Sequence, residues 1–215
     1  TIAAKSLLAL TAKISTSFTT KGWNLLHNEF STAFTEDKIR DFCKSCNEYV
    51  NMRTLYSQDR DVFIDNVYVP LNMSPVGDNS SVMEITGANL QSEGLLNVIG
   101  VAGQGKSTFM RKMLLNTIKS GSQIPIFFEL KYYADKPFLD QLIDWFEKHE
   151  IKVNKRVFKN LIKSNTFKLL LDGFDEIDPA LQDNAVVELK NFTNIFPKTT
   201  VIISTRPYTA ITKEP

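Results

Sequence analysis

At 215 residues, 43% of them hydrophobic and 23% charged, the chain can form one domain and part of a second, and wholesale disorder is excluded. Its 25 Lys and Arg residues balance 24 Asp and Glu residues, and a net charge of +1 argues against a dedicated non-specific nucleic-acid binder. Two cysteines exclude a disulfide-rich scaffold and suit the reducing cytoplasm, and no apolar run is long enough to span a membrane. We therefore expect a soluble, cytoplasmic protein.

Residues 1–60 are predicted to form a helical N-terminal region, because apolar residues recur at spacings of three and four. The apolar positions of the three stretches are Leu7, Leu10, Ile14 and Phe18, then Trp23, Leu26, Phe30 and Phe34, then Ile39, Phe42, Cys43, Cys46 and Val50. Thr35 is a plausible N-cap for the third stretch. Cys43 and Cys46 form a C-x-x-C pair, but they fall in mid-helix on the apolar face. Packed free thiols are therefore favoured over zinc or redox chemistry.

From residue 61 the pattern changes. Residues 62–71 are rich in Val, Ile and Tyr, and the Pro-, Gly-, Asn- and Ser-rich residues 72–81 are predicted to be a linker or loop. Beyond residue 94, near-continuous apolar runs predict buried strands at residues 95–99, 124–130, 167–171 and 200–204. Crossover helices are predicted between and after them, at residues 106–118, 138–149, 154–163 and 179–196. This alternation predicts an α/β domain with a parallel sheet, covering residues 61–215.

A glycine-rich segment at residues 100–108, with the sequence GVAGQGKST, matches the phosphate-loop pattern G-x-x-x-x-G-K-[ST]. Its glycines let backbone N–H groups surround a phosphate, and the following helix adds its positive end. Lys106 is expected to reach the β- and γ-phosphates, and the Ser107 hydroxyl to bind Mg²⁺. The nucleotide-binding residues predicted in this loop are Gly100, Gly103, Gln104, Gly105, Lys106, Ser107 and Thr108.

Acidic residues follow the third predicted strand, in the sequence LLLDGFDE at residues 169–176. Asp172 stands at the strand end and is predicted to hold Mg²⁺, directly or through water, opposite the Ser107 hydroxyl. Either Asp175 or Glu176 is predicted to orient the attacking water as a base, with Glu176 preferred because it lies one helical turn beyond Asp172.

The fourth predicted strand ends in Ser-Thr-Arg-Pro, which places Arg206 before a rigid proline. An arginine at the end of a strand beside the phosphate loop is predicted to contact the γ-phosphate and report its presence.

These three motifs, in this order, resemble the NACHT family of STAND-type P-loop NTPases. That family's acidic motif is an apolar run followed by D-G-x-D-E, and its next strand ends in S/T-R-P; both are matched here. Upstream, Tyr68, Val69 and Pro70 look like the short extended segment that precedes the phosphate loop in many members and lies near the nucleotide base. The resemblance covers about residues 62–208.

The resemblance implies a three-layer fold whose parallel sheet has the order 5-1-4-3-2, with the arginine-bearing strand between the phosphate-loop strand and the acidic strand. It also implies slow hydrolysis of ATP with Mg²⁺, by a switch that rests closed with ADP and assembles into a homo-oligomer when triggered. Bacterial members serve antiviral defence and animal members serve innate immunity, and the Lys-, Asn- and Phe-rich sequence favours a bacterial member. The fifth strand and further domains are expected after residue 215, so we expect a fragment.

Other functions remain open, namely a nucleotide-binding scaffold that does not hydrolyse ATP and a mechanical ATPase of the AAA+ kind. The intact acidic motif favours hydrolysis, and the near-neutral charge counts against a DNA-driven machine. The N-K-x-D pattern of guanine-specific proteins is missing, which favours ATP over GTP. A basic stripe is expected to be a solvated helix face. Its members are Lys152, Lys155, Lys159 and Lys163.

Overall fold

The structure is a computed structural model that describes residues 30–54, 57–78, 81–85 and 93–212, together with residues 5, 8, 9 and 12. Several apolar positions of the first two predicted helical stretches lie outside these residues: Leu7, Leu10, Ile14, Phe18, Trp23 and Leu26. Within the described ranges, no helix is long and apolar enough to cross a membrane.

The centre of the fold is a four-stranded parallel sheet in the order β5-β8-β7-β6. Its strands are β5 (Gly94–Ile99), β6 (Ile124–Glu129), β7 (Phe167–Asp172) and β8 (Thr200–Thr205). Every residue of β8 is buried, as a strand covered on both faces requires. The arginine-bearing strand β8 lies between the phosphate-loop strand β5 and the acidic strand β7, which confirms the expected order of these four strands.

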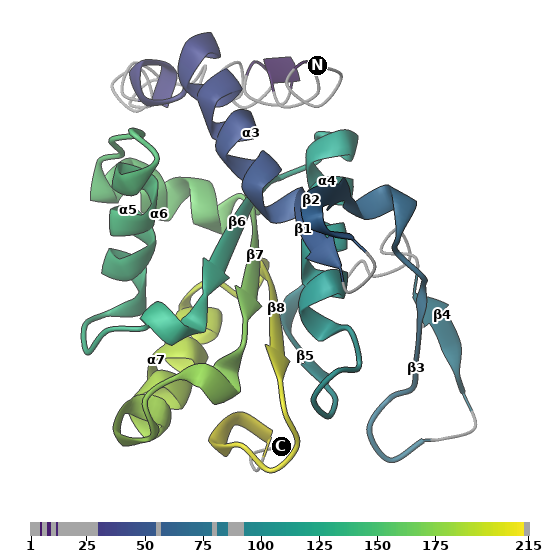
Figure 1. Cartoon of the computed structure of the whole chain (residues 1–215). Helices are drawn as coiled ribbons and strands as arrows, with labels where there is room; N and C mark the ends of the chain where they lie inside the picture. The colour runs from purple at the N-terminus through teal and green to yellow at the C-terminus, as the bar shows by residue number, and fades with distance from the viewer. Residues whose placement is uncertain are drawn as a thin grey trace.

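Helices cover both faces of the sheet, as the predicted three-layer α/β fold requires. Figure 1 shows α4 (Lys106–Ser120) on one side and α5 (Phe138–Lys148), α6 (Lys155–Lys163) and α7 (Gln182–Ile195) on the other. The helices begin and end close to their predicted boundaries. The clearest difference is at the last one, where a 3₁₀ turn at Pro179–Leu181 precedes α7. Asp178 caps that turn by accepting a hydrogen bond from the Ala180 N–H at 2.9 Å.

The N-terminal helix α3 (Glu36–Val50) starts directly after Thr35, whose carbonyl accepts the first helical hydrogen bond from Ile39 at 2.9 Å. Its apolar face packs on the α/β core through aromatic contacts. Phe42 meets Trp145 of α5 edge to face, and Tyr49 meets Phe127 of β6 with ring centroids 4.7 Å apart. Within the described residues, the predicted helical character is therefore confirmed for α3, up to Val50.

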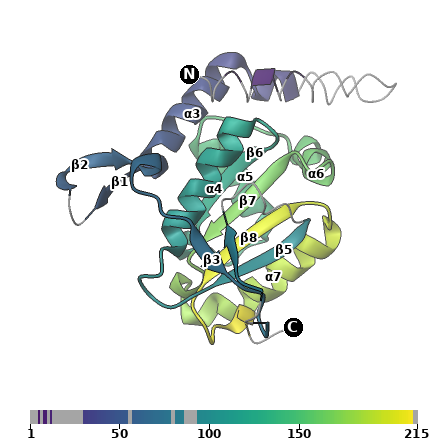
Figure 2. The same ribbon diagram turned by 90° about the vertical axis from the view of Figure 1, so that its right-hand side faces the viewer.

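Two antiparallel hairpins follow α3. The strands β1 (Asn51–Thr54) and β2 (Ser57–Phe63) pair with each other, so the helix predicted through residue 60 is wrong beyond Val50. The helical spacing of apolar residues ends at Val50. In the polar stretch that follows, backbone N–H and C=O groups are paired between the two strands. Figure 2 shows this hairpin projecting from the body of the domain. The strands β3 (Leu71–Met73) and β4 (Met83–Ile85) form the second hairpin, and the described residues 74–78 and 81 of the predicted linker lie between these strands.

Candidate functional site

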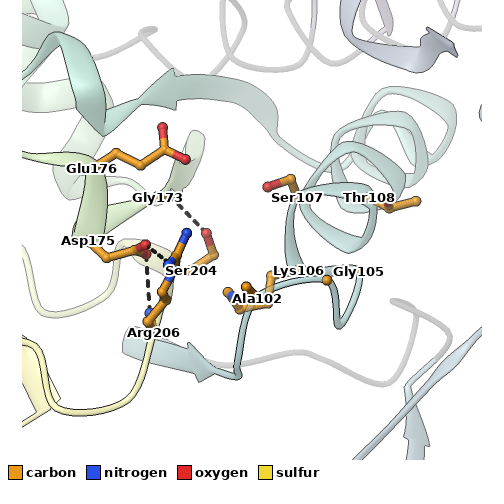
Figure 3. A pocket seen from close by; sticks show the side chains of 11 residues that line it. Ala102, Gly105, Lys106, Ser107, Thr108, Gly173, Asp175, Glu176, Ser204 and Arg206 are labelled. Atoms are coloured by element: carbon orange, nitrogen blue, oxygen red, sulfur yellow. Dashed lines mark hydrogen bonds and ion pairs between the residues drawn. The ribbon is translucent and has the colours of Figure 1, made fainter. Parts of the chain in front are cut away.

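A pocket of about 330 Å³ lies at the carboxyl edge of the sheet, between the start of α4 and the loops after β7 and β8 (Figure 3). This volume falls within the range of ordinary ligand pockets. Its lining residues are Ala102, Gly103, Gly105, Lys106, Ser107, Thr108, Gly173, Asp175, Glu176, Ser204 and Arg206. The phosphate loop, the acidic motif and the arginine motif thus meet in one place, as expected where the carboxyl ends of parallel strands converge.

The phosphate loop connects β5 directly to α4. Gly103 and Gly105 have φ angles of 80° and 81°, a left-handed conformation that glycine adopts without strain. Gly105 is also the residue that precedes the first turn of α4, where unpaired backbone N–H groups and the helix dipole favour an anion. The geometry of the loop is therefore that of a phosphate cradle.

Polar side chains within the loop bind its own backbone. The Lys106 ammonium donates to the carbonyl oxygens of Gly100 and Val101, at 2.6 and 3.0 Å. The Gln104 side-chain oxygen accepts from the Val101 N–H at 2.8 Å and lies so close to Gly100 that a Cβ there would be 2.4 Å from it. An ammonium has three hydrogens, so Lys106 keeps one for a ligand while these two bonds hold it over the loop.

Asp172 lies at the end of β7, where hydroxyl groups from two other elements reach it. The Ser107 hydroxyl of α4 donates to its Oδ1 at 3.2 Å, and the Ser204 hydroxyl of β8 donates to the same oxygen. The Ser204 oxygen in turn accepts from the Gly173 N–H at 2.8 Å. One buried hydroxyl therefore connects the arginine-bearing strand to the acidic motif.

The oxygen ligands of this corner suit Mg²⁺. The cation is usually held by one or two protein groups, with water and substrate phosphates completing its shell, and Asp172 and Ser107 supply such a pair. Among the described residues, no cluster of three or more His, Cys, Asp or Glu side chains is able to hold a metal by itself.

Asp175 and Arg206 form an ion pair on one side of the pocket, opposite the phosphate loop (Figure 3). Arg206 Nε lies 2.7 Å from Asp175 Oδ2, and the Arg206 backbone N–H donates to Asp175 Oδ1 at 3.2 Å. Glu176 lies apart from this pair in Figure 3, with its side chain over Gly173. A Cβ at Gly173 would be 3.1 Å from the Glu176 carboxyl carbon, and its φ of 79° also requires glycine.

A further pair of charges lies at the same edge, at the end of the neighbouring strand β6. Glu129 is in register with Asp172 and accepts a hydrogen bond from Lys131 at 2.9 Å. This hydrogen bond is the main cause of a raised pKa for Lys131, and the nearby Glu176 carboxylate raises it further. The edge of the sheet therefore carries several carboxylates interleaved with basic groups.

The structure brings most of the predicted site residues together, and it places some of them elsewhere. Gly103, Gly105 and residues 106–108 line the pocket with Asp175, Glu176 and Arg206. Gly100, Gln104 and Asp172 do not line the pocket, but they contact residues that do or belong to the same loop. Ala102 and Ser204 also line the pocket and were not among the predicted site residues, although a small polar residue ending an apolar strand run was a signal for Ser204.

The upstream segment predicted to lie near the base does not line this pocket. The Tyr68 hydroxyl donates to the carbonyl of Ile85 at 3.4 Å, its ring lies beside Lys112 of α4, and burial raises its pKa. Val69 is 75% exposed and Pro70 is exposed as well. A base-contacting role for these three residues stays a prediction.

Comparison with known proteins gives one family match. Residues 95–213 match the NACHT domain, a segment that spans the phosphate loop, the acidic motif and the arginine motif. No curated protein matches the chain. Because the family match covers more than half of the chain and the four strands have the order expected for it, the chain belongs to the NACHT family of nucleotide-binding P-loop NTPases.

Proposed function

We propose that this domain binds ATP or ADP with Mg²⁺ in the pocket at the carboxyl edge of the sheet and hydrolyses ATP slowly. The observation that supports this most is the convergence of the phosphate loop, the Asp172–Ser107 contact and the Arg206 side chain around a single pocket. These are the parts that phosphoryl transfer needs, namely a cradle for the phosphates, a place for Mg²⁺ and a cation for the transferred group.

Each part has a proposed role in binding. The backbone N–H groups of residues 103–108 surround the β-phosphate, and Lys106 exchanges a carbonyl contact for oxygens of the β- and γ-phosphates. Ser107 and Asp172 hold Mg²⁺, the first directly and the second directly or through water.

The proposed reaction is attack of water on the γ-phosphorus, with cleavage of the bond to the β-phosphate oxygen and release of ADP and phosphate. Glu176 orients this water and accepts its proton, because its carboxylate is exposed beside the pocket. Asp175 is the alternative base on the same 3₁₀ turn. Arg206 stabilises the negative charge on the γ-phosphate.

In the whole protein we propose that this chemistry controls a signalling switch. ADP holds a closed state and ATP permits assembly into a homo-oligomer, in antiviral or innate immune defence. Nucleotide, a second copy of the protein and an unidentified trigger are then the partners. Nucleic acid is disfavoured by the net charge of +1, and free cysteines at positions 43 and 46 fit a cytoplasmic location.

Binding of ATP to the protein with and without Mg²⁺ tests the proposal, and Lys106→Ala is the decisive variant. Loss of the ammonium from a phosphate site is expected to weaken ATP binding at least tenfold, about 1.4 kcal/mol. Lys119→Ala is the matched control, because it removes the same charge from the far end of α4, where Lys119 pairs with Asp65. Unchanged ATP affinity in Lys106→Ala would mean that the nucleotide binds elsewhere.

A further inference from the structure

Arg206 donates from both its backbone and its side chain to one carboxylate, that of Asp175. The backbone N–H reaches Oδ1 at 3.2 Å and Nε reaches Oδ2 at 2.7 Å, so both carboxylate oxygens face the same residue (Figure 3). Such charge-assisted bonds are directional, and two of them fix the position and the orientation of the guanidinium. Asp175 thus holds both the chain and the side chain of Arg206.

The two members of this pair differ in exposure. The Asp175 side chain is only 15% exposed, whereas that of Arg206 is 57% exposed. The carboxylate is therefore the fixed member, seated on the 3₁₀ turn after β7, and the guanidinium is the member that faces the opening of the pocket. Because the bond to Asp175 uses Nε, the two terminal amino groups of Arg206 stay available for an anion.

The same geometry separates the roles of the two neighbouring acids. A base needs an oxygen lone pair directed at water, and it must accept a proton without losing its partners. Protonation of Asp175 would remove the negative charge that strengthens both of its bonds to Arg206, the proposed γ-phosphate contact. Glu176 carries no such tie to Arg206 and is exposed at the pocket.

We propose that Asp175 is a positioning residue, which holds Arg206 where it distinguishes a triphosphate from a diphosphate, and that it is not the base. This inference rests on the proposed function. Its consequence is that removing Asp175 should reproduce the effect of removing Arg206, since both changes take the guanidinium away from the γ-phosphate position.

The test measures the affinities of the full-length protein for ATP and for ADP in the presence of Mg²⁺. The variants are Asp175→Ala, Arg206→Ala and the double variant, with Asp183→Ala on α7 as an exposed acidic control. Either single change is expected to lower the ratio of ATP to ADP affinity by about tenfold, the effect of losing one charge-assisted bond to phosphate. The double variant should lose no more than either single one, because the two residues act as one unit.

The ratio of affinities separates positioning from a general loss of structure, since a partly unfolded protein loses ATP and ADP binding alike. If Asp175→Ala fails to fold, Asp175→Asn replaces it. An amide keeps one acceptor oxygen, so this variant should lose part of the preference for ATP. Its rate of phosphate release at saturating ATP should stay within about tenfold of wild type, whereas loss of a base costs 10²–10⁴-fold.

Two results would overturn the positioning role while leaving nucleotide binding intact. One is an unchanged ratio of ATP to ADP affinity in Asp175→Ala together with a reduced ratio in Arg206→Ala. The other is an Asp175→Asn variant that keeps both affinities but no longer releases phosphate, which would make Asp175 the base. If the wild-type protein binds neither nucleotide, the proposed function and this inference both fail.

Discussion

The Ser204 hydroxyl makes hydrogen bonds to two residues of the acidic motif. Ser204 is 1% exposed and contacts both Asp172, at the end of the acidic strand, and the following Gly173. A serine hydroxyl has one hydrogen, and the structure directs it to Asp172 while the oxygen accepts from Gly173. This arrangement fixes Oδ1 of Asp172, and in the proposed function the other oxygen would face Mg²⁺ or its water.

Ser204→Ala is expected to weaken Mg·ATP binding about fivefold, the cost of one hydrogen bond, while binding of ATP in EDTA changes little. The physical reason is that the carboxylate loses the donor that orients it toward the cation. Titration calorimetry at several Mg²⁺ concentrations measures the effect. Ser120→Ala, which removes a hydroxyl at the far end of α4, is the control. Equal losses with Mg²⁺ and with EDTA would show that Ser204 does not act through the metal.

Glu176→Gln is expected to keep ATP affinity and to lower phosphate release at least 100-fold, because the amide no longer accepts a proton. In the full-length protein the variant should also retain the assembled state. Phosphate release at saturating Mg·ATP is the measurement, and Glu147→Gln on the exposed surface of α5 is the control. Normal release by Glu176→Gln would reject it as the base. If the wild-type protein binds ATP but releases no phosphate, the non-hydrolysing scaffold is favoured.

At the scale of whole elements, the apolar face of α3 buries the two cysteine side chains. Cys46 is 3% exposed on this face and Cys43 is half-buried, and both are free thiols, as predicted. Burial raises the pKa of Cys43 to about 11, and it raises the pKa of Cys46 further. A thiol reacts as the thiolate, so both residues should be inert near neutral pH.

We therefore expect iodoacetamide to label the native protein slowly at pH 8, with Cys43 reacting faster as the pH rises toward 11. The sign follows from the raised pKa, since the thiolate of Cys43 forms only at high pH. Mass spectrometry of Cys43→Ser and Cys46→Ser variants assigns the sites, and protein unfolded in urea supplies the fully reactive reference. Rapid labelling of either native thiol at pH 7 would show that α3 does not pack as described.

At the scale of the whole molecule, the pocket formed by the described residues is partly open to solvent. The sheet edge, α4 and two loops line it, and both Glu176 and Arg206 are exposed there. Exclusion of water and completion of the site commonly require a second surface that closes over the nucleotide. We expect another domain or a second copy of the protein to supply it.

It follows that the 215-residue chain by itself should bind ATP but turn it over at well below about 1 s⁻¹, the low end for ordinary enzymes. Steady-state phosphate release over a range of protein concentrations measures this. A rate that rises with concentration would identify a second copy as the closing surface. Turnover of several per second by the dilute chain would show that the pocket needs no closure.

The central sheet, its covering helices and the phosphate loop could all be predicted from local sequence patterns. Strands buried on both faces are near-continuous apolar runs, as in β6, and a cradle for phosphate needs glycines at fixed spacing, as at positions 103 and 105. These requirements are local, so a short stretch of sequence contains them. The amphipathic spacing that predicted α3 is local in the same sense. The prediction of a helical region failed where this spacing stops, at the β1–β2 hairpin.

Which side chains meet at the carboxyl edge depends instead on how the strands are arranged in space. Asp175 and Arg206 are 31 positions apart, as are Gly173 and Ser204, and they come together because β7 and β8 are neighbours in register. From sequence alone, Glu176 was preferred as the base only for its spacing from Asp172, and Asp175 remained the alternative. The ion pair that distinguishes them arises from strand order and from the turn after β7. A contact between residues that are distant in sequence depends on how their elements pack, and not on either residue's own neighbours in the chain.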